Sequence, residues 1–494
     1  MEYQSTRDSA VRVSSAQAIT QGISREGGLF VPESLPVLSP EDYRSLAKKS
    51  YVERADAVLS RFLTDFTGEE IASCTRAAYT SDRFGSADVA PLHSLDDRTH
   101  ILELWHGPTC AFKDMALQML PHLLTASLVK TEEEKTVCIL VATSGDTGKG
   151  ALEGFRDVDR TRILVFYPKD GVSAIQELQM VTQEGKNVGV CSVFGNFDDA
   201  QTGVKKLFSD EALRQELARR GYFLSSANSI NWGRVLPQIV YYISAYCDLL
   251  RDEKIQPDQA VNVCVPTGNF GNILAAYYAR EMGVPIDRLI CASNSNNVLT
   301  DFIRTGRYDR NRAFHNTISP SMDILISSNL ERLLLALTQD DEQVKDYMAQ
   351  LSATGTYQVS DRVREKLQKR FAGYFCDDAE TKAVIGRIYQ KYDYLIDPHT
   401  AVAFDALEQY RSETGDQTPC IVVSTASPFK FCDSVLSALG EEEKQNGLEL
   451  LDELSEKTGM PAPKPLASLR DKEIRFTQTV EKDHMVDAVL GMLE

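Results

Sequence analysis

The sequence predicts an α/β protein built on parallel sheets. Between residues 96 and 295, short apolar runs alternate with stretches of helical periodicity, which is the pattern of βαβ units. Two of these apolar runs end in a glycine-containing loop that leads directly into a helical stretch. The first 95 residues instead carry helix-start signals without this alternation, so they are expected to form a separate, mostly helical unit.

The predicted strands are short, apolar and bounded by loop residues. They are the run around Ile101–Trp105, then Thr136–Ala142, Ile163–Tyr167, Val188–Val193, Val261–Val265, Leu289–Ala292 and Ile421–Ser424. Predicted helices begin near Ser39–Asp42, Thr67–Glu70, Asp114 and Lys149, and span Ile273–Met282, Glu331–Leu351 and Ser360–Arg370. Pro121 falls inside the helix after Asp114, which we expect it to kink or end.

A chain of 494 residues is too long for one ordinary core, so two or three domains are expected. We expect an N-terminal helical unit at 1–95 and a smaller α/β domain at 96–225 that carries Lys113 and the first glycine loop. A larger α/β domain at 226–494 would carry the second glycine loop and end in a helical tail.

Composition excludes several classes of function. The net charge of −18 argues against nucleic acid, because phosphate backbones require clustered Lys and Arg. No apolar stretch approaches the ~20 residues that span a bilayer, and the N-terminus lacks a signal-peptide pattern. Ten scattered cysteines form no CxxC pair, which indicates a reducing compartment and no metal site. A cytoplasmic protein is expected.

Lys113 is the first candidate for chemistry. In the stretch Leu102–Gln118, an apolar run breaks at Gly107-Pro108, and a helical pattern resumes at Asp114. An amine at a helix N-terminus loses its proton more easily, and an uncharged amine can attack a carbonyl to form a Schiff base. The alternative is an exposed, solvated lysine, which is the common case for this residue type.

Two glycine loops and a pair of hydroxyls add to this candidate site. The loops are Thr143–Gly148 and Thr267–Asn272, each placed between a strand and a helix, and Ser424-Thr425 ends a third strand. Neither loop matches a Walker or GxGxxG motif, and glycine there can serve the turn alone. Together they would meet at the carboxyl edge of a parallel sheet, where ligands bind. Two anion cradles and an amine fit pyridoxal phosphate with an amino-acid substrate.

Longer motifs point to a family. HGPTCAFKD (106–114), ATSGDTG (142–148), NSINWGR (228–234), PTGNFGN (266–272) and SPSMDI (319–324) resemble threonine synthase of the long bacterial and fungal type. YQSTRD (3–8), GGLFVP (27–32) and DPHTAV (397–402) resemble it too. The resemblance implies a fold-type-II pyridoxal 5'-phosphate enzyme that converts O-phosphohomoserine and water to threonine and phosphate. It would act on a small molecule as a monomer or homodimer.

The resemblance also implies roles for individual residues. Lys113 would hold the Schiff base and shuttle protons, and Thr425, or the adjacent Ser424, would meet the ring nitrogen. The cofactor phosphate would lie in the loop formed by Gly268, Asn269, Phe270, Gly271 and Asn272. Substrate would be held at its carboxylate by Ser144, Gly145, Asp146 and Thr147, which could instead flank the cofactor ring, and at its phosphate by Asn231 and Arg234.

Asp146 departs from the common fold-type-II pattern, in which an asparagine donates to the phenolic oxygen of the cofactor. A carboxylate cannot donate that hydrogen bond unless it is protonated, so Asp146 could instead anchor its loop. Two rival functions remain open on the same fold. One is an O-phosphohomoserine phospho-lyase that releases 2-oxobutyrate, and the other is a non-catalytic relative.

Overall fold

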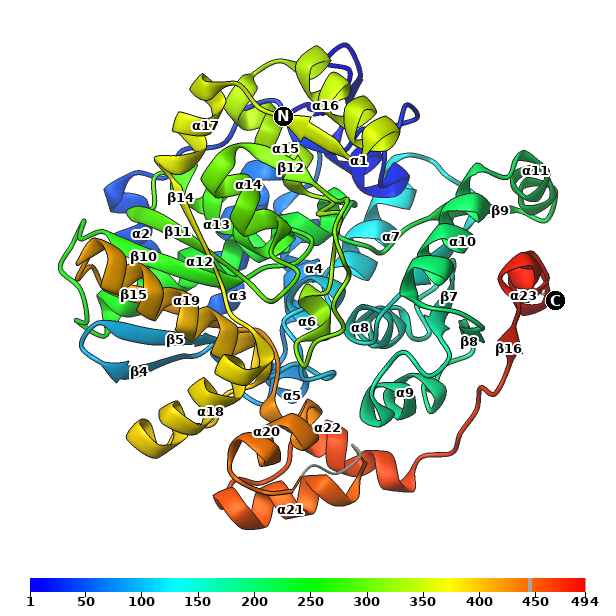
Figure 1. The fold of residues 1–494 in the computed structure, drawn as a ribbon. Helices are drawn as coiled ribbons and strands as arrows, with labels where there is room; N and C mark the ends of the chain where they lie inside the picture. Colours follow the sequence, from blue (N-terminus) through cyan, green and yellow to red (C-terminus); the bar gives the residue numbers. More distant parts are fainter. Residues whose placement is uncertain (443–446, 494) are drawn as a thin grey trace.

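The computed structural model, which describes residues 1–442 and 447–493, contains two main sheets (Figure 1). The larger has the order β14-β11-β10-β15-β5-β4 and is parallel except at β4 (Leu92–Asp96), which runs antiparallel to β5. Its other strands are β5 (Thr99–Glu103), β10 (Val261–Pro266), β11 (Ile286–Ser293), β14 (Phe371–Phe375) and β15 (Cys420–Ser424). The predicted parallel α/β architecture is confirmed.

The smaller sheet has the order β16-β8-β7-β6-β9 and is parallel throughout. Its strands are β6 (Thr136–Ala142), β7 (Thr161–Pro168), β8 (Val188–Val193), β9 (Tyr222–Ser225) and β16 (Thr479–Val480). The predicted strands are all present, whereas β4, β9, β14 and β16 were not predicted. Most of these are half-exposed edge strands, and β14 is interrupted by Gly373, so none forms a continuous apolar run.

Strand pairing differs from the expected division of the chain in two places. β5, expected in the smaller domain at 96–225, pairs with β15 in the larger sheet. At the other end of the chain, β16 pairs with β8 in the smaller sheet, although residues 226–494 were expected to form the larger domain. Both departures arise because hydrogen bonding joins segments that lie hundreds of residues apart, which local periodicity does not reveal.

The N-terminal unit is mostly helical, as predicted, but it also holds a three-stranded antiparallel sheet of order β2-β1-β3. Ser39 and Thr67 cap α2 and α4 through capping boxes, which confirms both predicted helix starts. The elements are β1 (Tyr3–Ser5), β2 (Arg12–Val13), β3 (Phe30–Pro32), α1 (Ser15–Gln21), α2 (Pro40–Leu46), α3 (Tyr51–Phe62), α4 (Gly68–Ala78) and α5 (Ser81–Phe84).

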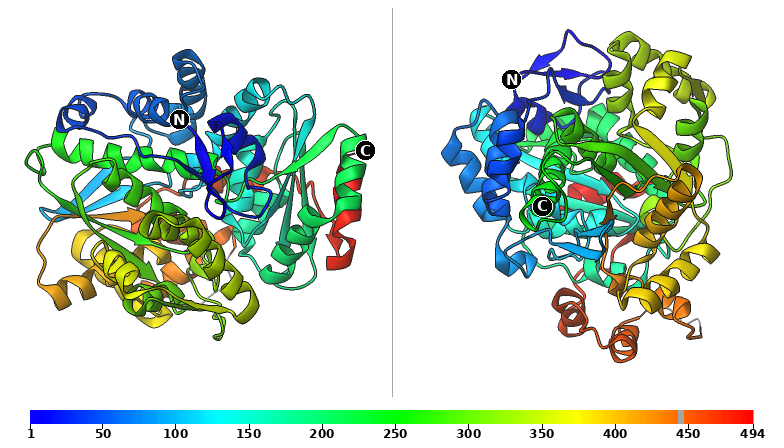
Figure 2. Two further views of the ribbon diagram at one scale, coloured as in Figure 1. Left: turned by 90° about the horizontal axis from the view of Figure 1, so that it is seen from above. Right: turned by 90° about the vertical axis from the view of Figure 1, so that its left-hand side faces the viewer.

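Helix α12 (Trp232–Arg251) lies at the centre of the molecule and is buried on almost every side. It packs against α2 and α3 of the N-terminal unit and against α13 (Gly271–Glu281), which follows β10. One apolar core therefore runs from Tyr3 through Leu59 and Ile239 to Val263. The N-terminal unit shares the core of the sheets, and its three-stranded sheet lies at the opposite end of the molecule from the segment 432–467 (Figure 2).

Two predicted helices are each divided in two. The helix containing Pro121 becomes α6 (Asp114–Leu117) and α7 (Leu120–Lys130), with the proline in the first turn of α7, where its missing N–H has no cost. The single helix predicted over Glu331–Leu351 is wrong. It is α15 (Leu330–Thr338) and α16 (Asp341–Thr354), separated by Gln339 in the left-handed region at φ 57°.

The remaining elements cover the two sheets. Around the smaller sheet lie α8 (Asp146–Phe155), α9 (Ala174–Val181), α10 (Phe197–Ser209) and α11 (Glu211–Arg219). The larger part has α14 (Val298–Thr305), β12 (Arg307–Asp309), η1 (Pro320–Met322), β13 (Thr356–Gln358), α17 (Asp361–Gln368), α18 (Asp378–Tyr392), α19 (Pro398–Thr414) and η2 (Pro428–Lys430). The C-terminal tail has α20 (Cys432–Ala438), α21 (Glu449–Thr458), α22 (Lys464–Ala467), η3 (Ser468–Asp471), η4 (Lys482–His484) and α23 (Met485–Met492).

Within residues 1–442 and 447–493, no helix is long and apolar enough to cross a bilayer. The same residues contain no cluster of three or more His, Cys, Asp or Glu side chains that could hold a metal ion.

Candidate active site

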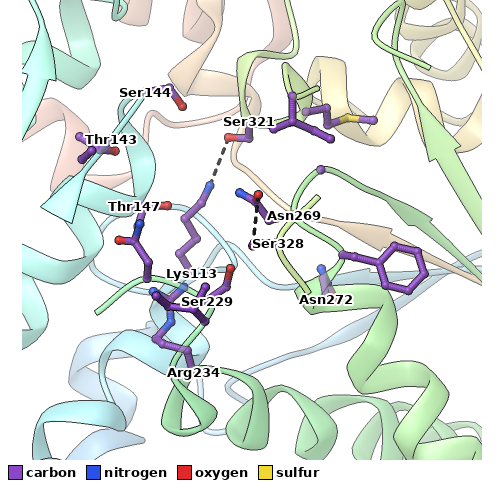
Figure 3. Close-up of a pocket in the computed structure, with 18 of the residues that line it drawn as sticks. Lys113, Thr143, Ser144, Thr147, Ser229, Arg234, Asn269, Asn272, Ser321 and Ser328 are labelled. Atoms are coloured by element: carbon purple, nitrogen blue, oxygen red, sulfur yellow. Dashed lines mark hydrogen bonds between the residues drawn. The ribbon is translucent and has the colours of Figure 1, made fainter. Parts of the chain in front are cut away.

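A cavity of about 240 Å³ lies where the loops after β6, β10 and β15 meet (Figure 3). The structure brings most of the predicted site residues to its wall. These are Lys113, Ser144, Thr147, Arg234, Gly268, Asn269, Phe270, Gly271, Asn272 and Thr425. Four predicted residues, Gly145, Asp146, Asn231 and Ser424, are not among those that line it.

Lys113 is buried and points into this cavity, with only 9% of the residue exposed, which rules out the solvated alternative. Its Nζ lies 3.1 Å from Ser321 Oγ and 3.5 Å from Asp146 Oδ2. Burial lowers the pKa of the amine, Asp146 opposes that shift, and the positive charges of Lys430 and Arg234 add to it. The pKa shift has the direction expected from the sequence, and its largest cause is burial.

The loop after β10 leaves hydrogen-bond donors free toward the cavity. α13 starts at Gly271 without a side-chain cap, so its first N–H groups have no protein acceptor of that kind. Asn272 Oδ1 accepts from the hydroxyls of Tyr241 and Tyr242, while its Nδ2 is buried without a partner. A Cβ at Gly268 would come within 2.6 Å of the Ser321 carbonyl oxygen. The loop is thus shaped and polarised for an anion.

The loop after β6 is ordered from within. Thr143 Oγ1 accepts from the N–H groups of Gly145 and Gly148, which folds the loop over the start of α8. Gly145 has φ 131°, and a Cβ there would lie 2.4 Å from the Gln176 side chain, so this position requires glycine. Ser144 and Thr147 are left facing the cavity opposite Asn269 and Asn272 (Figure 3).

Asp146 sits behind this loop rather than in the cavity. Its Oδ1 lies 2.8 Å from Lys430 Nζ and accepts from Gln176 Nε2 at 2.9 Å, while Oδ2 faces Lys113 and Ser321. Burial alone would raise the pKa of this carboxyl, but Lys430 and then Lys113 hold it far below its usual value. These contacts fit the anchoring role, and Asp146 is not among the residues that line the cavity.

Asn231 and Ser424 have other partners. Asn231 caps α12 through Oδ1, and its Nδ2 donates to the carbonyl of Ile19 at 3.0 Å. Its position does not fit the predicted contact with a substrate phosphate. Ser424 Oγ accepts from Trp105 Nε1 at 3.0 Å and from Thr400 Oγ1 at 3.1 Å, outside the cavity. Only its neighbour Thr425 reaches the wall, so Thr425 is the better candidate of the pair.

Arg234 does reach the cavity and is almost wholly buried. One nitrogen donates to the Ala227 carbonyl, and Nε is buried without a partner. Burial lowers the pKa of the guanidinium to about 10, so it stays charged near pH 7. A buried cation with a free donor at a cavity wall suits an anionic group of a ligand.

Sequence reasoning missed Lys430, Ser321 and His399. Lys430 is fully buried, and its only local signal is a charge placed between Phe429 and Phe431. Ser321 donates its N–H to His399 Nε2 at 3.2 Å, and His399 Nδ1 lies 2.7 Å from Asp397 Oδ2. Ser321 belongs to the motif SPSMDI, and Asp397 and His399 belong to DPHTAV. Both motifs carried the resemblance, but no local pattern gave these three residues a role.

These residues fit pyridoxal phosphate. The loop after β10 supplies a glycine-lined cradle and an unpartnered buried amide for a phosphate, and Lys113 supplies an amine whose uncharged form is favoured. Thr425 adds a hydroxyl at the end of β15. The donor set matches what that cofactor requires.

Comparisons with known proteins agree with the site. Residues 90–426 match the family model of pyridoxal-phosphate dependent enzymes. Residues 2–79 match the model of the threonine synthase N terminus, and residues 400–489 match that of the threonine synthase C-terminal region. Fold and cavity therefore define a pyridoxal-phosphate-dependent enzyme of fold type II.

Similar proteins of known name show which family of pyridoxal-phosphate-dependent enzymes the chain belongs to. Threonine synthase of Pseudomonas aeruginosa is 38% identical over 443 residues, which are 89% of this chain and 90% of that protein. Threonine synthase of Saccharomyces cerevisiae is 34% identical over 99% of this chain and 97% of its own. PLP-bound threonine synthase from Brucella melitensis superimposes with a TM-score of 0.88 at 36% identity, covering 100% of both chains. The chain belongs to the threonine synthase family.

A further group of relatives is longer. Human threonine synthase-like 1 is 42% identical over 439 residues, which are 87% of this chain but only 58% of that protein. The chain thus spans about three fifths of the length of these relatives.

Proposed function

We propose that this protein converts O-phosphohomoserine and water to L-threonine and phosphate. The observation that carries the proposal is the buried Lys113 amine, which faces a cavity bounded on one side by the anion-binding loop of α13 and on another by the Arg234 guanidinium. Names of relatives that match most of both chains support the same activity.

In this proposal, the cofactor is held by Lys113 at its aldehyde, by Gly268–Asn272 at its phosphate and by Thr425 at its ring nitrogen. When bound, pyridoxal phosphate withdraws electrons from the carbon atoms next to the substrate amino group. A hydroxyl such as that of Thr425 stabilises a proton on the ring nitrogen less than a carboxylate would, which favours chemistry at the β and γ carbons.

The substrate carries two anionic groups that need separate partners. Ser144 and Thr147 offer hydroxyls near the uncapped start of α8 for the carboxylate, while Arg234 offers a buried charge for the phosphate. The two partners lie on different walls of the cavity, with Lys113 between them (Figure 3). This placement orients the substrate so that its α and β carbons face Lys113 Nζ.

Lys113 is the base in the proposal. Its Nζ removes a proton from Cα, passes that proton on within the site, and then removes a proton from Cβ, which places negative charge beside the phosphate-bearing carbon. Phosphate then leaves, the hydroxyl of water adds at Cβ, protons return to Cα and Cγ, and the remaining proton of water goes with the released phosphate. A base used in several steps works best when its pKa lies near the operating pH, and burial shifts that of Lys113 in this direction. The Ser321 hydroxyl, 3.1 Å away, can hold the amine in line between these steps.

The test measures phosphate release and organic products with O-phosphohomoserine as substrate. We expect equimolar phosphate and threonine, whereas 2-oxobutyrate as the main product would favour the phospho-lyase. Lys113→Ala should fold, lose the visible absorption of bound cofactor and lose turnover by about a thousandfold or more. Lys345→Ala, at an exposed lysine paired with Glu342, is the matched control and should keep full activity. Full activity in Lys113→Ala would refute the proposal.

We further propose that the enzyme acts in the cytoplasm as a monomer or homodimer, with no nucleic-acid partner. The net charge of −18 supports the absence of a nucleic-acid partner, and the ten cysteines, all free and buried, support a reducing compartment. Light scattering after size-exclusion chromatography would distinguish these states from larger assemblies.

A further inference from the structure

Three ionisable groups from distant parts of the chain meet behind the wall of the cavity. They are Lys113 at the start of α6, Asp146 in the first turn of α8 and Lys430 in η2. Asp146 lies between the two lysines, with Oδ1 at 2.8 Å from Lys430 Nζ and Oδ2 at 3.5 Å from Lys113 Nζ. None of the three has more than a tenth of its surface exposed.

If all three groups were charged, the cluster would carry a net charge of +1 away from water. An uncompensated buried charge costs several kcal/mol, so one lysine is favoured to be neutral. The contacts distinguish the two. Lys430 has no exposed surface, makes the short contact to Asp146 and donates to the Thr109 carbonyl at 2.9 Å. Lys113 has the longer ionic contact and a neutral hydroxyl partner.

We propose that Lys430 is a positioning residue that serves as the permanent ammonium partner of Asp146 and so leaves Lys113 as the uncharged amine of the cluster. This inference rests on the proposed role of Lys113. Lys430 does not line the cavity, and it acts on Lys113 in two ways, by balancing the Asp146 carboxylate and through its own positive charge. It also explains why this chain has an aspartate where an asparagine would be expected to donate to the cofactor: the carboxylate is needed to balance a buried lysine.

Other charged groups near Lys113 also influence its protonation. Arg234 on α12 adds to the positive field, and Asp114 lies next to Lys113 on α6, where it accepts from Thr109. His399, Asp323 and Lys205 complete the ionisable lining of the cavity in the described chain. Since these groups stay unchanged in variants of Lys430 and Asp146, differences among such variants report on the cluster itself.

Single and double substitutions make opposite predictions. In Lys430→Met, Asp146 has only Lys113 as a cation, so Lys113 should keep its proton to higher pH. In Asp146→Asn, Lys113 faces Lys430 without a carboxylate and should lose its proton at lower pH. The double variant Asp146→Asn, Lys430→Met removes both charges and should return near the parent value. General damage to the site would not produce shifts of opposite sign that cancel.

The experiment follows uptake of pyridoxal phosphate by the full-length chain freed of cofactor, through visible absorption, as a function of pH. The pH midpoint of the uptake rate should rise by about 1 unit or more in Lys430→Met, fall in Asp146→Asn and be restored in the double variant. Lys430→Arg, which keeps the charge, should stay near the parent. Lys345→Met is the control at an exposed lysine.

Borohydride reduction and peptide mass spectrometry then identify the labelled residue. Label at a residue other than Lys113 would overturn the proposed function. Label at Lys113 with the same midpoint in all variants would overturn the role of Lys430 and leave the proposed function standing. If Lys430→Met does not fold, Asp146→Asn alone decides, because an unchanged or higher midpoint in that variant contradicts the inference.

Discussion

Two helix starts flank the Lys113 amine, and each buries an aspartate in its first turn. Asp146 begins α8 and Asp114 begins α6. Lys430 meets Asp146 at 2.8 Å, and the pKa of that carboxyl is far below its usual value. Asp114 accepts hydrogen bonds from the N–H and hydroxyl of Thr109, and burial raises its pKa to about 6. Of these two buried carboxyl groups, the one that contacts a buried lysine has its pKa lowered, and the other has its pKa raised.

The two sites are also linked, because Thr109 takes part in both. Its N–H and hydroxyl donate to Asp114, while its carbonyl accepts from Lys430. The loop that leads into Lys113 is therefore fixed at Thr109, which binds Asp114 through its donors and Lys430 through its carbonyl. This arrangement fixes the backbone beside the amine and separates one ionised carboxylate from one that readily takes a proton.

The largest effect is expected for Asp146→Asn. This change leaves Lys430 buried without a counter-charge, which should lower the free energy of unfolding by about 3–5 kcal/mol. Because folding lowers the pKa of Asp146, its contribution is complete above about pH 5 and is lost only as the pH falls below the usual range of an aspartate. Urea unfolding at pH 5, where the contribution of Asp146 is complete and the lysines of the parent cluster are compared before any further titration, should show this difference from the parent.

Glu69→Gln is the matched control, because it removes an exposed ion pair. Arg76 Nη2 lies 3.0 Å from Glu69 Oε1, and both side chains are largely exposed. Its cost should stay below about 1 kcal/mol. An equal cost for both substitutions would mean that burial does not set the strength of the Asp146 contact.

Asp114→Asn should change the pH dependence of stability rather than shift it uniformly. Folded Asp114 keeps its proton up to about pH 6, whereas the unfolded chain releases it near pH 4, so stability from this group falls as pH rises between those values. The loss reaches about 3 kcal/mol for two pKa units at about 1.4 kcal/mol each. The difference between parent and variant should slope from pH 4 to 6 and be flat above 7, and a flat difference throughout would contradict it.

The contrast between the two aspartates shows what the sequence could predict. The strand–loop–helix units, the place of Lys113 at a helix start and the convergence of two glycine loops all follow from local patterns of apolar residues and glycine. Lys430 lies 317 residues from Lys113 in the chain, and nothing in the local sequence pairs it with Asp146. Contacts of this kind come from sheet order, as do β5 in the larger sheet and β16 in the smaller one.

The sequence also failed where a side chain has a choice of partners. Asn231 reads as a phosphate ligand next to Arg234, yet its amide caps α12 and holds the carbonyl of Ile19. The N-cap position satisfies a backbone donor that would otherwise be unpaired, and that local demand takes precedence. Arg234, three residues later, has no such demand on Nε and remains free for a ligand.

The smallest effect on the free energy of unfolding is expected from the backbone conformation at the start of α8, which differs from that at the start of α6. α8 begins after Gly145 at φ 131°, whereas α6 begins after Lys113 in ordinary helical geometry, so only α8 depends on a glycine. Gly145→Ala should lower the free energy of unfolding by about 1–3 kcal/mol through strain and contact with Gln176. Gly68→Ala, where a Cβ meets nothing within 4 Å, should leave stability unchanged or slightly raised.

Because Gln176 also holds Asp146 at 2.9 Å, displacing it should weaken cofactor uptake in Gly145→Ala but not in Gly68→Ala. Equal uptake in the two variants would show that α8 can start without its glycine and still keep Asp146 in place.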